Sequence, residues 1–508
     1  MLVDNTLAQL PDETLIDLSE RILHTAPETA ELAPLSPAHL HDLRDADDSV
    51  ERQAAMTALI AWVTENREAI SQLYPYEAPP FDHLQSYWEN FYRGPRKGDD
   101  HAAVLEPSEP PAFRFLGFEL GIPFGVPACA VTPHSGYVDY FARRGFDLIT
   151  YKTVRNGPWN PHPSPNLAFA AQVRTPLAEA DLEQPVIPTM YPDALNGTTD
   201  ASFVNSIGVP SLPVEQWMAD VARTRGLLRA GQVLIVSVMG SPELLDRHDV
   251  QGLIDQFERV ACAADEAGTD IIELNLSCPN TGGQLICLDP ELSGRITAAV
   301  RRRVGDTPIL IKICHMPEPE LAALVTACRP SMNGVVAINA VQVHAQRPDG
   351  GAFFADRKDD FAGLSGVGIR GLGLAVTRSL SRLRGDEQAS PDDWVIVGIG
   401  GVASAADYQA YKDAGADAVQ SCTGAWLNPH LAHEVRVHAL GARHAAAGDT
   451  ERPSVVSGRA ENGAVAAGAR THPWLRLFHA VNDTVRTGAL NLRVEEPEPR
   501  DARDRRPR

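Results

Sequence analysis

From Phe113 onward, short apolar segments alternate with longer segments in which apolar residues recur about every three to four positions. Short β-branched runs are typical of buried strands, and the wider spacing is typical of amphipathic helices. Eight strands are predicted, at Gly125–Ala130, Leu148–Thr153, Val233–Met239, Ile271–Leu276, Ile309–Ile313, Gly334–Asn339, Val395–Ile399 and Ala418–Cys422. Helices are predicted at Leu253–Ala267, Pro290–Val304, Glu318–Cys328, Gly373–Arg384 and Ala405–Ala414. Eight strand–helix units predict an α/β fold, a closed (β/α)8 TIM barrel whose functional groups lie at the C-terminal ends of its strands.

The pattern divides the chain into a helical N-terminal extension and linker (1–110), the barrel (111–445) and a C-terminal extension (446–508). Helical spacing at Thr14–Leu23 and Val50–Leu73 predicts a small cap that packs on the barrel or binds a partner. His472–Ala480 predicts one docking helix, and Glu495–Arg508, with no apolar residue beyond Ala and Pro, predicts a disordered tail. Residues 155–230 are too long for a simple crossover and predict an inserted hairpin or lid.

Composition narrows the classes of partner. Lys and Arg total 45 against 66 Asp and Glu, and this net charge of −21 argues against a nucleic-acid or anionic-membrane surface. No apolar run approaches the roughly 18 residues of a transmembrane helix, and Met1–Glu20 lacks the apolar core of a signal peptide. The seven Cys form no Cys-x-x-Cys pair or Cys/His cluster, which argues against zinc or iron–sulfur sites and favours a reducing, cytoplasmic compartment.

The strongest chemical signal lies at the end of the fourth predicted strand. There Asn275, Ser277, Cys278 and Asn280 follow a buried apolar run, and Gly282-Gly283 then forces a loop. The two Asn amides suit a planar ring that bears N–H and C=O groups, and Cys278 can act as nucleophile or general base. A tight turn with a small buried Cys is the structural alternative for these residues taken alone.

Asn275-Leu-Ser-Cys-Pro-Asn280 resembles the active-site loop of dihydroorotate dehydrogenases and of the pyrimidine-reducing domain of dihydropyrimidine dehydrogenase. Both are FMN-dependent β/α barrels, so the resemblance, which spans roughly residues 113–438, implies FMN as the cofactor. It also implies that Cys278 is the catalytic base and Ser277 a further catalytic residue, and that Asn275 and Asn280 bind the substrate. In the cytosolic class of these dehydrogenases the base is Cys, and in the membrane-associated class it is Ser.

Two lysines stand at other strand ends. Lys152, followed by Thr153, ends the second strand, and Lys312 lies inside the apolar fifth strand. A buried Lys is costly without a partner, which an anionic flavin or a hidden Glu would provide equally well. The family resemblance implies that Lys152, Thr153 and Lys312 lie beside the flavin, with Lys152 also a catalytic residue.

Two further amides are predicted to bind substrate. Asn205 lies in Phe203-Val-Asn-Ser-Ile-Gly, which resembles the family's Ile-Asn-x-x-Gly loop, and Asn339 ends the sixth strand. Where the family continues with Thr or Ser after that Asn, this chain has Ala340. The loss of a hydroxyl leaves open which ring the site prefers.

Glycine turns point to a phosphate site. The predicted turns Ala362–Gly366 and Gly398–Val402 each lead into a helix, and backbone N–H groups at Gly366, Gly400 and Gly401 can approach an anion closely. Cys422 and Thr423 follow the eighth strand, and barrels commonly bind phosphate in the loops after strands 7 and 8. We expect these residues, together with Ala128 after the first strand, to bind FMN.

These observations predict an FMN-dependent oxidoreductase that oxidises dihydroorotate or a related dihydropyrimidine ring. One alternative is a dihydropyrimidine dehydrogenase-like reductase, which would need a partner chain because no iron–sulfur motif is present. Another is an inactive barrel that serves as a binding protein. No Rossmann-type nicotinamide fingerprint is evident, so fumarate, a quinone or a partner protein all stay open as electron acceptor. We expect a cytoplasmic homo-oligomer, for example a dimer.

Overall fold

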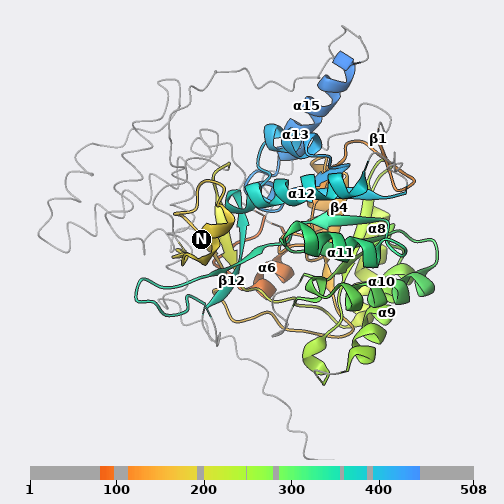
Figure 1. Ribbon diagram of the computed structural model, residues 1–508, viewed down its shortest axis with the longest axis horizontal. Helices are drawn as coiled ribbons and strands as arrows, with labels where there is room; N and C mark the ends of the chain where they lie inside the picture. The colour runs from red at the N-terminus through yellow and green to blue at the C-terminus, as the bar shows by residue number, and fades with distance from the viewer. Residues whose placement is uncertain are drawn as a thin grey trace, which may run out of the picture. The chain divides into compact units, whose positions relative to one another are not determined.

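The computed structural model describes residues 80–95, 113–190, 199–246, 249–277, 285–354, 360–385 and 393–446 (Figure 1). All of them belong to one compact unit, Tyr76–Thr471. The helices predicted before residue 80 and after residue 446 lie outside the described residues. None of the helices in the described ranges is long and apolar enough to cross a membrane.

Eight parallel strands close into a barrel, in the order β3-β4-β7-β8-β9-β10-β13-β14 and back to β3. The strands are β3 (Phe124–Val126), β4 (Leu148–Val154), β7 (Val233–Val238), β8 (Ile271–Asn275), β9 (Ile309–Ile313), β10 (Gly334–Ala337), β13 (Val395–Ile399) and β14 (Ala418–Gln420). All eight predicted strands are therefore confirmed, although several end one to four residues earlier than predicted. The predicted (β/α)8 barrel is confirmed with them.

Helices connect the strands and cover the outside of the barrel. They are α7 (Ser135–Arg143), α8 (Val214–Leu227), α9 (Val250–Glu266), α10 (Pro290–Val304), α11 (Glu318–Cys328), α12 (Arg370–Arg384), α13 (Ala405–Asp413), α14 (Thr423–Leu427) and α15 (Leu431–Ala446). Each helix from α8 to α12 contacts the next, and Figure 1 shows α9 to α12 as successive neighbours. Local sequence signals set the ends of these helices, as α10 shows. Asp289 caps its N-terminus by accepting from Leu292 N–H, and Gly305 ends the helix at φ 60°.

Apolar side chains fill the N-terminal end of the barrel. Leu148, Val233 and Ile271, each at the start of its strand, share one buried cluster with Phe115 and Leu120. These two residues come from an antiparallel hairpin, β1 (Phe113–Phe115) and β2 (Phe118–Leu120). The hairpin thus covers this end of the barrel, and the opposite end carries the polar strand ends.

A second sheet lies outside the barrel order. It has the order β11-β12-β6-β5, from β5 (Leu167–Phe169), β6 (Ser202–Asn205), β11 (Val341–His344) and β12 (Phe361–Gly366). The insertion predicted within residues 155–230, a hairpin or lid, contains the antiparallel pair β5–β6. The prediction that residues 362–366 form only a glycine turn is wrong, because they pair with β6 as a strand before the chain enters α12.

Residues 80–95, which precede the barrel in the sequence, pack against it. They contain α6 (Tyr87–Arg93), whose N-terminus is closed by a capping box of Ser86 and Glu89. The Tyr137 hydroxyl on α7 donates to the Asn90 carbonyl at 3.1 Å, and Trp426 Nε1 donates to the Phe81 carbonyl at 2.7 Å. This segment therefore forms part of the same unit as the barrel.

Candidate active site

One pocket opens at the C-terminal ends of the barrel strands, with a space of about 1250 Å³ between its lining atoms, part of it open to solvent. The predicted residues that line it are Ala128, Lys152, Thr153, Asn205, Asn275, Lys312, Asn339, Gly366, Gly400, Gly401, Cys422 and Thr423. The structure thus brings together residues from almost every strand end.

Both predicted lysines are buried at the pocket. Lys152 is 8% exposed and Lys312 is 3% exposed. On the neighbouring strand β8, Glu273 is fully buried, but neither of its carboxylate oxygens has a partner among the described residues, so it forms no ion pair with Lys312. A buried ammonium without a carboxylate partner is unfavourable, so Lys312 favours an anionic ligand in the pocket.

Hydrogen bonds orient the amides at the ends of β8 and β10. Asn275 Nδ2 donates to Thr153 Oγ1 at 3.3 Å, and that hydroxyl lies 2.9 Å from Ser237 Oγ. Ser277 donates to Asn275 Oδ1 at 3.3 Å, and its carbonyl accepts from Asn339 Nδ2 at 3.1 Å. These contacts fix the amide planes in advance, as recognition of a planar ring requires.

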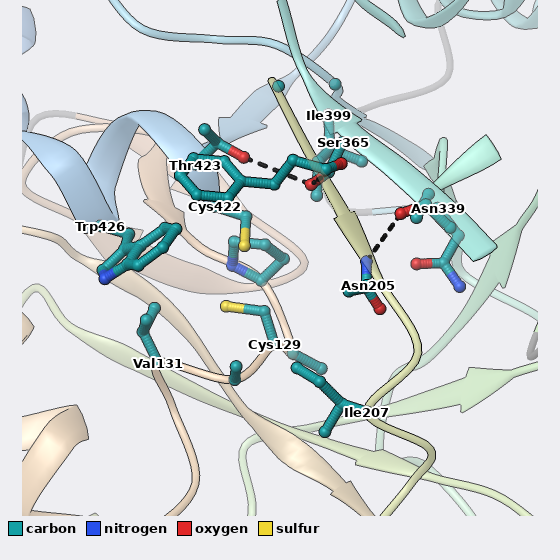
Figure 2. A pocket seen from close by; sticks show the side chains of 18 of the residues that line it. Cys129, Val131, Asn205, Ile207, Asn339, Ser365, Ile399, Cys422, Thr423 and Trp426 are labelled. Atoms are coloured by element: carbon teal, nitrogen blue, oxygen red, sulfur yellow. Dashed lines mark hydrogen bonds between the residues drawn. The ribbon is translucent and has the colours of Figure 1, made fainter. Parts of the chain in front are cut away.

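The second sheet carries the remaining described amide to the pocket. Asn205 Nδ2 donates to the Gly363 carbonyl at 3.0 Å, and Figure 2 shows Asn205 and Asn339 on neighbouring walls. A Cβ at Gly363 would lie 3.0 Å from Ala340 Cβ and 3.3 Å from Asn205 Nδ2. Ala340 therefore presents a small apolar surface beside these amides.

The loops after β12, β13 and β14 form a tight cradle. A Cβ at Gly366 would lie 2.2 Å from the Ala201 carbonyl, and Gly401 has φ +66° and would place a Cβ 2.7 Å from the Gly366 carbonyl. Only glycine fits these positions. Hydrogen-bond donors remain available here, because the backbone N–H groups of Gly400, Gly401, Cys422 and Thr423 have no backbone acceptor among the described residues.

This donor set suits a phosphate, which accepts from several N–H groups at once. Thr423 Oγ1 adds a hydroxyl 3.5 Å from Ser365 Oγ (Figure 2). The observed cradle and the buried Lys312 at the same pocket fit a phosphorylated flavin.

Some functional residues could not be predicted from the sequence, and some predictions cannot be placed. The pocket is also lined by Phe81, Cys129, Ile207, Ser365 and Trp426. Ser365 directly precedes the predicted Gly366 and could have been recognised from it. Phe81 lies in a segment with no regular apolar spacing, so no local signal marks it.

The loop that carries the predicted base is a separate case. Cys278 and Asn280 lie outside the described residues. Ser277, directly before them, is buried and does not line the pocket; it holds the Asn275 and Asn339 amides instead.

Comparison with known proteins agrees with this geometry. Residues 191–439 match the sequence model of the family described as dihydroorotate dehydrogenase. Dihydroorotate dehydrogenase from Dictyostelium discoideum is 27% identical over 374 residues, which cover 71% of this chain and 97% of the relative. The catalytic subunit of dihydroorotate dehydrogenase B (NAD(+)) from Methanocaldococcus jannaschii is 29% identical over 232 residues, 44% of this chain and 67% of the relative.

The corresponding catalytic subunit from Pyrococcus furiosus is 32% identical over 202 residues, 38% of this chain and 58% of the relative. The matched segments include the strand ends that line the pocket from Asn205 to Trp426. The motif at Asn275–Asn280 predicted the same family from the sequence alone. Residues 191–439 of the barrel therefore match the dihydroorotate dehydrogenase family of oxidoreductases.

Proposed function

We propose that this chain is an FMN-dependent oxidoreductase that converts dihydroorotate, or a closely related dihydropyrimidine, to the unsaturated ring. The observation that carries the proposal is the convergence of two buried lysines, three oriented amides and a glycine cradle on one pocket. A protein that only binds a ligand would not need two buried lysines at the same pocket as amides that can recognise a planar ring. Similarity to the dihydroorotate dehydrogenases supports the same reaction.

The proposed cofactor site uses the cradle and the lysines. Gly366, Gly400, Gly401 and Thr423 would hold the FMN phosphate through N–H and hydroxyl donors, and Lys312 would lie beside the ring system. When bound, FMN supplies a two-electron acceptor for hydride. Lys152 and Lys312 would favour the extra negative charge that follows reduction.

The proposed substrate site uses the amides. Asn205, Asn275 and Asn339, with Asn280 from the following loop, would donate to the ring carbonyls and accept from the ring N–H groups. This arrangement holds the ring in one plane and one orientation. Ala340 adds no hydrogen bond, so selectivity would rest on the four amides.

The proposed base is Cys278. Its thiolate would accept the proton from one ring carbon while the adjacent carbon loses its hydride. The positive charges of Lys152 and Lys312 at the pocket favour a thiolate nearby. Ser277 would keep the amides in register with the reacting carbons.

The role of Cys278 predicts a separation of chemistry from binding. Cys278→Ala should lower turnover about 100-fold or more, the range of general-base catalysis, while FMN stays bound. Cys262→Ala, on α9 away from the pocket lining, is the matched control and should keep full activity. Both variants are assayed by the formation of orotate from dihydroorotate. Fumarate, NAD+ and a soluble quinone are tested in parallel as electron acceptors. A Cys278→Ala enzyme with normal turnover would remove Cys278 as the base.

A further inference from the structure

The strand pair β14–β3 places two thiols together. Gln420 is in register with Gly125, and Ser421 N–H donates to the Gly125 carbonyl at 2.9 Å. The loops that follow these strands therefore run side by side, with Cys422 on one and Cys129 on the other. Figure 2 shows both sulfur atoms in the same part of the pocket, and both residues line it.

Both thiols are reachable from the pocket. Cys129 and Cys422 are only half-buried, and their side chains lie on neighbouring loops of the same pocket (Figure 2). Thr132 Oγ1 accepts from Cys129 N–H at 3.3 Å and donates to the Pro127 carbonyl at 3.2 Å, which holds the Cys129 loop in place. A disulfide requires the two sulfur atoms to come to roughly 2.05 Å, which rotation of side chains on neighbouring loops can bring about.

The surroundings make the pair asymmetric. Although burial raises it, the pKa of the Cys129 thiol is lowered overall by the neighbouring Cys422 side chain, the Val131 N–H and the charges of Lys312 and Lys152. The neighbouring Cys129 side chain and burial raise the pKa of Cys422. Cys129 is therefore the thiol that ionises first, and the thiolate is the form that attacks oxidants.

We propose that Cys129 and Cys422 form an oxidisable thiol pair, a modification site for peroxides, which a ligand in the pocket protects. The protection rests on the proposed FMN site, since Cys422 belongs to its cradle; the pairing itself does not. Loss of the ligand would expose the two thiols to peroxide. The disulfide would therefore form only in chains whose pocket is empty.

The reaction balances with hydrogen peroxide as the oxidant. The Cys129 thiolate attacks one peroxide oxygen, the O–O bond breaks, and a sulfenic acid and hydroxide form. The Cys422 thiol then attacks the Cys129 sulfur, the S–O bond breaks, and water leaves as the Sγ–Sγ bond forms. Two thiols are oxidised by two electrons in total, and one peroxide is reduced to two waters.

A second pair in the barrel provides an internal control. Cys287 Sγ lies 3.3 Å from Cys314 Sγ, but these residues are 1% and 7% exposed and do not line the pocket. These two sulfur atoms are close enough to react with each other, but peroxide has less access to them than to Cys129 and Cys422. Proximity without access therefore predicts slow oxidation there.

The test treats the purified full-length chain with graded hydrogen peroxide, in its flavin-loaded and flavin-depleted forms. After alkylation and digestion without reductant, mass spectrometry measures the Cys129–Cys422 cross-linked peptide. We expect it in the depleted chain, before any Cys287–Cys314 peptide. With FMN at about ten times its dissociation constant it should form about tenfold more slowly, because only the empty fraction reacts.

Variants and outcomes separate the two parts of the proposal. Cys129→Ser and Cys422→Ser should each abolish the cross-link, and Cys287→Ser should leave it. A depleted chain that forms no cross-link would overturn the thiol pair. If the cross-link formed equally fast in the depleted chain and in a chain whose spectrum shows bound flavin, the proposed protection would be overturned. A chain that binds no FMN would count against the proposed function, while the cross-link in that chain would still support or overturn the pair.

Discussion

Lys312 is the residue on which the proposed cofactor site most depends. It is buried inside β9, and no described carboxylate pairs with it. A lysine in this position costs stability unless a ligand supplies the negative charge. Its charge therefore points to an anion in the pocket and not to a role in packing.

Lys312→Met should weaken FMN binding by about 2–5 kcal/mol, at least about 30-fold in Kd, because it removes one partner of a desolvated charge pair. The ratio of flavin to protein after purification, and FMN titration by fluorescence, measure the change. Lys412→Met on α13 is the control, since its Nζ donates to the Asp417 carbonyl away from the pocket. An unchanged flavin content in Lys312→Met would make Lys312 a structural residue.

At this scale the sequence allowed the polar strand ends to be predicted. Asn275 and Lys312 interrupt apolar runs, and residues that break a buried pattern stand out locally. Phe81 and Cys129 carried no such signal, because their place in the pocket depends on contacts made far along the chain. Trp426 reaches the pocket through its hydrogen bond to the Phe81 carbonyl, which no periodicity predicts.

At the scale of elements, His134 joins α6 to the barrel. Its Nδ1 accepts from Gly136 N–H at 3.0 Å and caps α7, so the ring proton lies on Nε2, which is 2.9 Å from the Phe91 carbonyl. Its ring also packs on Phe91 and Tyr137 with centroids 4.7 and 5.1 Å away. A second proton on Nδ1 would remove the cap.

Acid should therefore loosen this contact. Burial lowers the pKa of His134 below its ordinary value near 6.5, so the folded chain favours the neutral ring. The unfolded chain binds the proton more readily, and the stabilisation, complete above about pH 6.5, is lost as pH falls toward the folded value. Asn also caps helices but does not titrate here, so His134→Asn is the matched variant.

Thermal unfolding of both proteins from pH 7.5 to 5.5 tests this account. The melting temperature of the unsubstituted chain should fall relative to that of His134→Asn as the pH decreases. Parallel curves would show that His134 does not contribute to the pH dependence.

The elements differed in how far they could be predicted. The barrel strands are buried on both faces and give continuous apolar runs, which is why all eight were found. The pair β11–β12 was missed: Val341–His344 alternates in burial over only four residues, and β12 contains two glycines that resemble a turn. The pairing of β12 with β6 makes these residues a strand, and a local sequence pattern cannot reveal a contact with residues so far away in the chain.

At the scale of the whole molecule, barrel closure is what assembles the site. Residues as distant in sequence as Thr153, Asn275 and Gly400 line one pocket because the parallel strands all end at the same face. The fold could be predicted from strand count alone. The cofactor, the substrate and the thiol pair are proposals that rest on what this face brings together.

The most direct test of the central claim is the visible spectrum of the purified protein, before and after anaerobic addition of dihydroorotate. We expect an oxidised flavin spectrum that bleaches as the substrate is oxidised, since the pocket would hold both molecules. A flavin that stays oxidised would contradict dihydroorotate as the substrate. A colourless chain that takes up no FMN on incubation would contradict the account of the pocket itself.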